Sequence, residues 1–198
     1  MHFIPSPNHD ARPEGMAVAL VLIHAISLPP DRFGGEGITQ LFTNTLNPDE
    51  HPYYAGIHTL RVSAHYLIRR DGALICFVPP ALRAWHAGVS CWQGQARCND
   101  FSIGIELEGC DTLPFEPEQY LALAELLERL AEAFPLRGIT GHADVAPGRK
   151  TDPGPLFSWR HLRSLLEARQ PALARCIEPT GGAEAALPVW PFPLGARP

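Results

Sequence analysis

Residue types that bind zinc in proteins lie at the ends of apolar segments of this chain. His24 follows the apolar run of residues 18–23, and a loop that begins at His142 reaches a carboxylate at Asp152. A catalytic zinc ion takes three nitrogen or oxygen ligands from the protein and keeps a fourth position open. Two imidazoles and one carboxylate would supply such a set. Lys150 in the same loop would place an ammonium group beside the metal, where it could stabilise an oxyanion.

Each of these residues also has an ordinary structural interpretation. A histidine at a strand end can simply be hydrogen-bonded, Asp152 can cap a turn before Pro153, and Lys150 can be a solvated surface charge. His24 is also far from the loop in the sequence. Residue types and spacing alone therefore leave both interpretations open.

A candidate general base lies in residues 102–107, which alternate in the manner of a β-strand with two different faces. The apolar face comprises Ile103, Ile105 and Leu107. The opposite face carries Glu106 and, just beyond, Glu108, so this parity predicts an acidic strand face. Either carboxylate could move a proton during hydrolysis, and the alternation does not distinguish them.

The strands that would position these residues are visible as short apolar segments. Residues 18–23 predict a strand buried on both faces, and residues 138–142 predict another short strand. Residues 61–69 and 73–78 flank an Asp-Gly pair, which predicts an antiparallel hairpin. The first of these strands would deliver His24 to the end of a sheet.

Helical periodicity is clearest in residues 117–134, which begin with proline and stop before Pro135. Ser158 is expected to cap a second helix over residues 159–169. Residues 38–46 predict a shorter helix. Helices that alternate with strands in this way predict an α/β or α+β domain.

The length of the chain fits one domain, which we assign to residues 1–170. Residues 79–99 are irregular and are expected to form a loop that walls a site. Residues 171–198 are rich in proline and contain a Gly-Gly pair, which predicts a loosely ordered C-terminal tail.

The bulk composition excludes several classes of partner. A net charge of −5 and a pI near 6.0 provide no basic footprint for nucleic acid or an anionic membrane. Residues 17–26 are too short to span a bilayer, and the first 20 residues lack the apolar region of a signal peptide. No protein partner is indicated, and we expect the protein to be cytoplasmic.

Five cysteines occur without C-x-x-C spacing: Cys76, Cys91, Cys98, Cys110 and Cys176. Such a set predicts neither a disulfide framework nor a thiolate zinc site, and reduced thiols in a cytoplasm account for it. None of the five lies in a recognisable nucleophile motif, which argues against a cysteine hydrolase.

Six long segments of the chain resemble the AmpD family of zinc-dependent N-acetylmuramoyl-L-alanine amidases, from about residue 5 to about residue 166. They are VLIHAISLPP, FGGEGITQLFTNTLNP, HPYYAGIHTLRVSAHYLIRRDG, RAWHAGVS, RCNDFSIGIELEGCDTL and GHADVAPGRKTDPGP. The wider superfamily includes phage lysozyme-like amidases and peptidoglycan recognition proteins. The resemblance therefore implies a single domain with a mixed central β-sheet flanked by helices.

The resemblance also implies roles for individual residues. The zinc ligands of the family correspond to His24, His142 and Asp152. Its catalytic glutamate corresponds to Glu106, which selects this residue over its neighbour, and its active-site lysine to Lys150. In such a site, zinc lowers the pKa of a water molecule toward ~7 and the glutamate moves the proton to the leaving amine.

Five further residues lie in segments that resemble the substrate-binding walls of the family. Arginine forks suit the carboxylates of an acidic stem peptide, and aromatic rings suit a sugar or peptide face, although a buried structural role suits the aromatic residues equally. The predicted substrate contacts are Arg61, Arg97, Asn99, Trp85 and His86.

Two positions depart from the family pattern. Ala25 follows the first ligand histidine, where the family often has asparagine, and Gly148 replaces a frequent acidic residue. Because outer residues tune metal sites, the pocket beside His24 is expected to differ from that of other members.

The function implied is hydrolysis of the amide between N-acetylmuramic acid, in its 1,6-anhydro form, and L-alanine during peptidoglycan recycling. The alternative is a non-catalytic module that binds muropeptides, as some superfamily members are. Such members typically lose a zinc ligand, whereas all three ligand positions are kept here.

Overall fold

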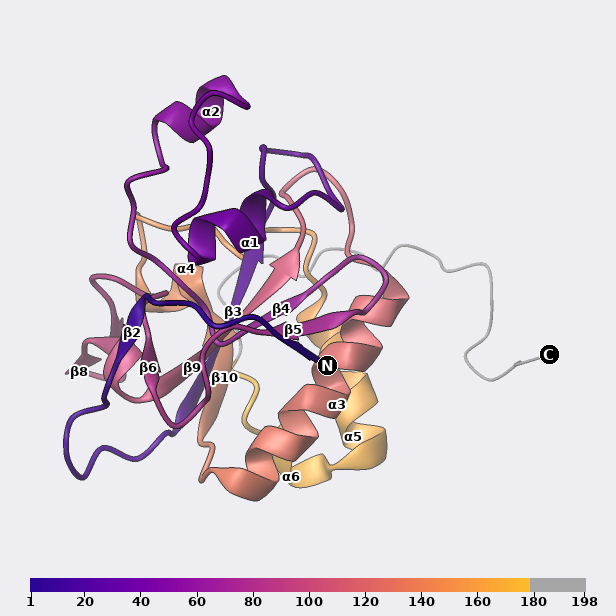
Figure 1. Ribbon diagram of the computed structural model, residues 1–198. Helices are drawn as coiled ribbons and strands as arrows, with labels where there is room; N and C mark the ends of the chain where they lie inside the picture. The colour runs from indigo at the N-terminus through magenta and orange to yellow at the C-terminus, as the bar shows by residue number, and fades with distance from the viewer. Residues whose placement is uncertain (179–198) are drawn as a thin grey trace.

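A six-stranded mixed β-sheet forms the centre of the molecule, in the order β1-β5-β4-β9-β3-β10 (Figure 1). The computed structural model describes residues 1–178. The strands of the central sheet are β1 (His2–Phe3), β3 (Leu20–Ile26), β4 (Tyr66–Ile68), β5 (Leu74–Cys76), β9 (Ser102–Glu108) and β10 (Gly138–Gly141). The helices are α1 (Gly37–Phe42), α2 (Pro52–Ala55), α3 (Pro117–Ala133), α4 (His142–Val145), α5 (Trp159–Arg169) and α6 (Pro171–Ala174). The predicted fold class, a mixed sheet flanked by helices, is confirmed.

The four adjacent strands β4, β9, β3 and β10 run parallel, and β10 lies at one edge of the sheet. In a parallel pair, residues opposite each other point to the same face of the sheet. His24 of β3 lies opposite Glu106 of β9, and Ile23 lies opposite Gly141, the last residue of β10. His142 therefore follows directly after β10, the strand that pairs with β3 next to His24.

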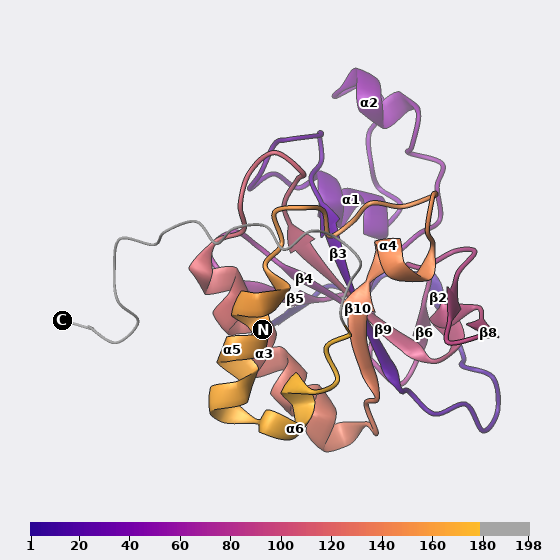
Figure 2. The same cartoon turned by 180° about the vertical axis from the view of Figure 1, so that it is seen from behind.

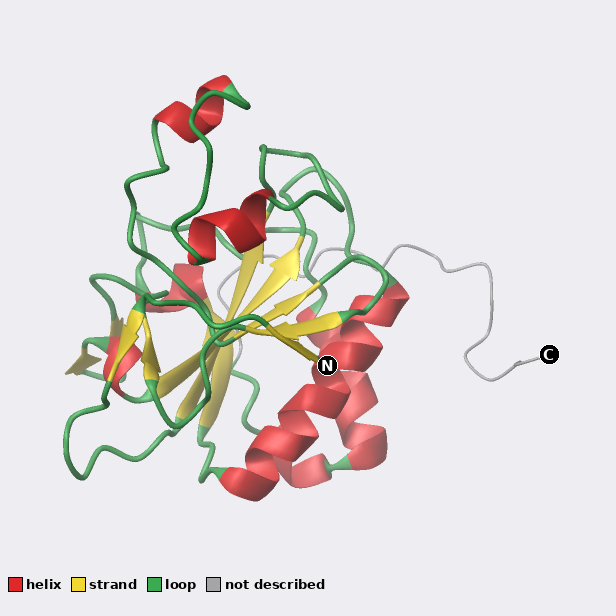
Figure 3. Ribbon diagram, in the orientation of Figure 1, coloured by secondary structure: helices red, strands yellow, loops and turns green. Residues whose placement is uncertain are grey.

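Both faces of the strand β3 are buried, as predicted for its apolar run. On one face, Val21 and Ile23 pack in a cluster that contains Leu127 of α3 and Leu166 of α5. On the other face, Leu20 and Leu22 join a cluster that contains Trp92. Figure 3 shows the helices α3 and α5 side by side against one face of the sheet. The strand continues to Ile26, so His24 lies inside it and not after its end.

The predicted hairpin is confirmed but is shorter than expected. The strands β4 and β5 pair antiparallel, with Ile68 opposite Leu74 across the Asp-Gly turn. Residues 61–65 lie outside the strand. The backbone of His65 instead hydrogen-bonds to Gly104 of β9 and to Phe77, the residue after β5, so His65 lies between these two segments.

The predicted helices are also found. The helix α3 begins at Pro117 and ends at Ala133, and the Ser158 side chain accepts a hydrogen bond from the backbone of His161 to cap α5. The helix α1 is shorter than the predicted residues 38–46. Gly37 at its start is closely packed, since a Cβ there would come within 2.8 Å of the Leu28 carbonyl oxygen.

The segment predicted as an irregular wall contains local order of its own. Two small antiparallel sheets form here: β2 (His9–Asp10) pairs with β6 (Arg83–Ala84), and β7 (Cys91–Trp92) pairs with β8 (Gln95–Ala96). A short 3₁₀ turn, η1 (Cys98–Asp100), leads into β9. The wall is thus braced against the N-terminal segment.

The folded domain extends beyond its predicted end at residue 170. The helix α6 follows at Pro171, and Leu173 and Ile177 are buried in the main core cluster. Ile177 also forms an isolated parallel bridge with Ile139 of β10. Residues 171–178 therefore belong to the domain and not to a tail. The remainder of the predicted tail, residues 179–198, lies outside the described residues.

Among the described residues, the helices fall short of the length and apolar character that a membrane crossing requires.

The contact between α3 and the start of α5 yields a stability prediction. Tyr120 is 2% exposed, and its hydroxyl accepts a 2.7 Å hydrogen bond from the backbone N–H of Ser158. Tyr120→Phe leaves this buried N–H without a partner and is expected to lower the free energy of unfolding by about 1–3 kcal/mol, measured by urea denaturation. Tyr53→Phe is the matched control, because Tyr53 is 47% exposed. Equal effects of the two substitutions would contradict the assignment.

Candidate metal centre and active site

Three potential ligand atoms from separate parts of the chain converge near the carboxyl ends of β3 and β10. The Nδ1 atom of His24 lies 3.0 Å from Nδ1 of His142 and 2.9 Å from Oδ2 of Asp152. The His142 Nδ1 lies 3.0 Å from the same carboxylate oxygen. These three side chains form the one group of potential metal ligands found among the described residues. The structure thus brings the three predicted ligands together.

A hydrogen bond at Nε2 of His142 determines which ring nitrogen carries the proton. It therefore also determines which form of Nδ1 faces His24 and Asp152. Its Nε2 lies 3.1 Å from the Ala87 carbonyl oxygen, which can only accept. Nε2 therefore carries the proton, and Nδ1 presents a lone pair toward Asp152 and His24. One shared proton can satisfy only one of the three close contacts, whereas a cation at the centre satisfies all three. Two nitrogens and one oxygen in this arrangement fit zinc.

The surroundings of His24 and Asp152 shift the pKa values of both side chains. Burial lowers the pKa of His24, which favours the neutral imidazole that a metal requires. Burial also opposes ionisation of Asp152, but its close contacts with His142 and His24 outweigh this effect and hold the pKa of this carboxyl well below its usual range. The centre therefore keeps the Asp152 carboxylate ionised beside a neutral His24 ring at neutral pH.

His86 contacts the Nε2 side of the His24 ring, away from Asp152 and His142. The Nε2 atom of His24 lies 3.0 Å from Nδ1 of His86, and the two rings pack edge to face. Burial, followed by the charge of His24, lowers the pKa of His86 well below its usual value, so its ring stays neutral and can accept a proton at Nδ1. The His86 ring lies against Gly104 of β9, where a Cβ would come within 2.5 Å of it.

Arg149 connects the loop between His142 and Asp152 to residues 87–89 of the wall. The sequence did not predict this contact. Its Nη2 donates to the carbonyls of Ala87 and Val89 at 2.7 and 2.6 Å, and lies 3.5 Å from His142 Nε2. The only signal in the sequence was the position of Arg149 next to Lys150 in a loop dense with candidate ligands. Carbonyl partners cannot be inferred from residue types.

The two carboxylates on the strand β9 differ in their surroundings. Glu108 accepts hydrogen bonds from the backbone of Gly34 at 2.7 Å and from Arg69 at 3.0 Å. Glu106 is 9% exposed, and its Oε2 has no hydrogen-bond partner among the described residues. Burial and then the charge of Asp152 raise the pKa of Glu106 well above its usual value, while Lys150 opposes the shift. Only Glu106 has a free oxygen available for a reacting group.

A groove of about 480 Å³ opens next to the metal centre. Asp152 and the exposed Lys150 line it together, as expected for residues two positions apart in an extended loop. Ala25 also lines the groove, so the departure from the family pattern falls on its surface. The opposite side is formed by residues 109–112, which include Cys110. Figure 2 shows the chain after α4 passing beside this end of the sheet.

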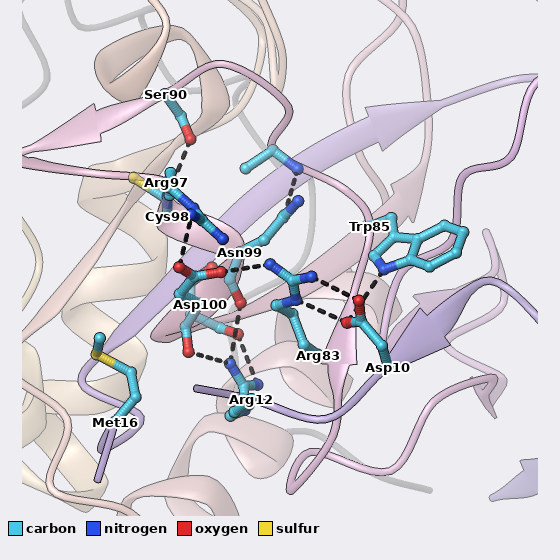
Figure 4. Close-up of polar contacts among 12 residues, drawn as sticks. Asp10, Arg12, Met16, Arg83, Trp85, Ser90, Arg97, Cys98, Asn99 and Asp100 are labelled. Carbon is cyan, nitrogen blue, oxygen red and sulfur yellow. Dashed lines mark hydrogen bonds and ion pairs between the residues drawn. The ribbon is translucent and has the colours of Figure 1, made fainter. Parts of the chain in front are cut away.

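None of the five predicted substrate contacts is among the residues found to line this groove. Arg61 is exposed and donates to nearby carbonyls, including that of Thr59 at 3.1 Å. Arg97 is also exposed and forms an ion pair with Asp100 at 3.1 Å. The indole nitrogen of Trp85 donates to Asp10 at 3.3 Å (Figure 4).

Asn99 and His86 both face inward. The Asn99 side-chain oxygen accepts hydrogen bonds from the backbone N–H groups of His86 and Ala87, at 3.2 and 2.8 Å. His86 itself contacts His24. Asn99 therefore binds the backbone of the segment whose His86 ring contacts His24.

Comparison with known proteins places these features in a family context. The chain matches the N-acetylmuramoyl-L-alanine amidase family, Amidase_2, over residues 14–155. It is 54% identical to the 1,6-anhydro-N-acetylmuramyl-L-alanine amidase AmpD of Citrobacter freundii over 165 residues, which cover 82% of this chain and 88% of that protein. The resemblance indicated by the six sequence segments is confirmed.

Solved structures show the same fold. A crystal structure of a selenomethionine derivative of AmpD superposes with a TM-score of 0.81 and 54% sequence identity, over 83% of this chain and 93% of that chain. The amidase AmiD from Escherichia coli, in complex with anhydro-N-acetylmuramic acid-L-Ala-D-gamma-Glu-L-Lys, superposes with a TM-score of 0.56 and 30% identity. That match covers 78% of this chain and 60% of the AmiD chain.

The close approach of His86 to β9 yields a prediction for Gly104→Ala. The added Cβ would displace the His86 ring and so remove its support from His24. Loss of such a partner typically weakens metal binding about 10–100-fold, and we expect a loss of zinc affinity in this range, measured by chelator competition. Gly56→Ala is the control, since the nearest atom to a Cβ there is 3.6 Å away. Unchanged zinc affinity in Gly104→Ala would contradict a supporting role for His86.

Proposed function

The chain belongs to the N-acetylmuramoyl-L-alanine amidase family, and we propose that it cleaves muropeptides with a zinc ion held by His24, His142 and Asp152. Its substrate is the amide between anhydro-N-acetylmuramic acid and L-alanine, consistent with the names of its relatives. This reaction belongs to peptidoglycan recycling. The protein is therefore an enzyme, and a muropeptide is its partner.

The observation that carries the proposed mechanism is the free oxygen of Glu106. This carboxylate sits on the strand next to His24, in register with it, and its Oε2 is buried without a hydrogen-bond partner in the described part of the chain. An unpaired buried oxygen costs folding free energy. Its position beside the three ligand atoms is explained if it exchanges protons with a water molecule and the substrate.

Each protein group then has one task. Zinc, when bound, supplies a Lewis acid that activates water and polarises the amide carbonyl. The raised pKa of Glu106 suits a group that takes a proton and returns it to the leaving nitrogen. The Lys150 ammonium lines the groove beside Asp152 and can stabilise negative charge on the substrate oxygen.

We propose that the groove beside the metal receives the substrate. Ala25 and Lys150 contribute to its surface, and Ala25 offers no side-chain hydrogen bond where asparagine is common in the family. Arg61 and Arg97 stay proposed contacts for carboxylates of the stem peptide, because their guanidinium groups are exposed. Asn99 and His86 are better explained by support of the metal ligands.

We also propose a cytoplasmic location. All five cysteines are free thiols. Cys91 in the wall is exposed, and Cys110 beside the groove is partly exposed. Exposed free thiols persist in a reducing compartment. Co-fractionation of the tagged protein with a cytoplasmic marker tests this location.

The role of the metal predicts the response to chemical inactivation. Treatment with a chelator is expected to abolish cleavage of a defined anhydro-muropeptide, and added zinc should restore it; product masses identify the bond that is cut. A thiol reagent should leave the chemistry intact, but Cys110 lines the groove and its modification would block access. The thiol arm therefore uses Cys110→Ser. Inactivation of that variant by a thiol reagent, with chelator resistance, would overturn the zinc mechanism.

The role of Glu106 predicts a separation of metal binding from rate. Glu106→Gln keeps the shape of the side chain but cannot carry the proton, so kcat is expected to fall by about 10²- to 10⁴-fold. Zinc content should be unchanged, as measured by metal analysis of the purified variant. Glu118→Gln, on the exposed side of α3, is the control. Loss of zinc from Glu106→Gln would instead identify this residue as a ligand.

A further inference from the structure

Both histidine ligands are supported by one dipeptide of the wall, His86-Ala87. The ring of His86 contacts Nε2 of His24 at 3.0 Å, and the carbonyl of Ala87 accepts from Nε2 of His142 at 3.1 Å. The orientation of each ligand ring therefore depends on where this dipeptide lies. Because the dipeptide follows the end of β6 and lies outside the central sheet, sheet pairing does not position it.

Asn99 binds the two backbone N–H groups of this dipeptide, whereas Arg149 donates to its Ala87 carbonyl. One oxygen, Oδ1, accepts from the N–H of Ala87 at 2.8 Å and from the N–H of His86 at 3.2 Å. An amide oxygen has two lone pairs, so both bonds can form together. The two N–H groups that it binds belong to the two residues that contact the ligand histidines.

The backbone of Asn99 is itself fixed from the opposite side (Figure 4). Arg12 donates to the carbonyls of Asn99 and Asp100, at 3.0 and 3.1 Å, and to that of Ser102 at 2.8 Å. The Asp100 carboxylate also accepts from Arg83 at 2.6 Å. The 3₁₀ turn η1 is thus held by Arg12 through backbone carbonyls and by Arg83 through the Asp100 carboxylate.

We propose that Asn99 is a positioning residue for the metal centre, which sets the orientation of His24 and His142 through the backbone of His86-Ala87. This inference rests on the proposed function, because it concerns the residues that hold zinc. It replaces the expectation that Asn99 contacts substrate. Its side-chain oxygen is occupied by the two N–H groups, and its residue is half-buried.

Two substitutions at position 99 separate acceptor chemistry from side-chain volume. Asn99→Leu has a similar size but no acceptor, and we expect it to weaken zinc binding about 10–100-fold, as loss of an outer partner does. Asn99→Asp retains an acceptor oxygen and is expected to keep an affinity close to that of the unchanged protein. Zinc affinity is measured by competition with a chromophoric chelator.

A second measurement needs neither zinc nor turnover. In the metal-free protein, the Ala87 amide hydrogen should exchange with solvent faster in Asn99→Leu than in the unchanged protein or in Asn99→Asp. Ser90→Ala is the matched control, because Ser90 braces the same wall by accepting from Cys98 and donating to Gly88. That variant should lose thermal stability while it keeps its zinc affinity.

The outcomes distinguish the inference from the function on which it rests. Failure of the unchanged protein to bind zinc overturns the proposed function, and the inference with it. If the unchanged protein binds zinc and Asn99→Leu binds it equally well, only the inference is overturned. A raised KM in Asn99→Leu, with zinc affinity and amide exchange unchanged, would return Asn99 to a substrate-binding role. An equal loss of zinc affinity in Ser90→Ala would show general loosening of the wall.

Discussion

The parallel pairing of β3 with β9 on one side and β10 on the other is the constraint on which the site depends. It places His24 opposite Glu106 and ends β10 one residue before His142. Both faces of β3 are packed in apolar clusters, so a slip of one residue would exchange the side chains of the two faces. Burial of apolar surface therefore fixes the relative positions of two of the proposed ligands and of Glu106, the proposed catalytic carboxylate.

Polar contacts outside the sheet orient the histidine rings whose backbone positions the sheet fixes. The sheet fixes where the ligand backbones lie, whereas ring orientation depends on the wall that contains His86. This wall is held by Arg12 and Arg83, whose charges are paired or fully hydrogen-bonded (Figure 4). Burial lowers the pKa of Arg12 to about 10, so its guanidinium keeps its charge at neutral pH. This half-buried network orders the wall because its members satisfy one another.

The sequence predicts the features that depend on local pattern. The double burial of β3, the hairpin at the Asp-Gly turn, the start of α3 at Pro117 and the Ser158 cap all follow from periodicity or turn chemistry. The convergence of His24 with a loop far along the chain came from family resemblance, because it depends on strand order. The bonds made by Asn99 were unpredictable for a different reason: their partners are backbone groups, which every residue has. The buried segment after Pro171 was missed because its few apolar residues have no period of their own.

The contrast between Glu106 and Glu108 shows how one strand face carries two different carboxylates. Both point to the same side of β9 and both are buried. Glu108 lies at the strand end, where Arg69 and two backbone N–H groups stabilise its charge. Glu106 lies two residues further into the strand, beside the proposed ligands, where its free oxygen costs about 1–3 kcal/mol. A fold selected for stability alone would satisfy that oxygen. The large apolar core on both sides of β3 offsets the cost, and the unsatisfied carboxylate keeps the proton affinity that amide hydrolysis needs.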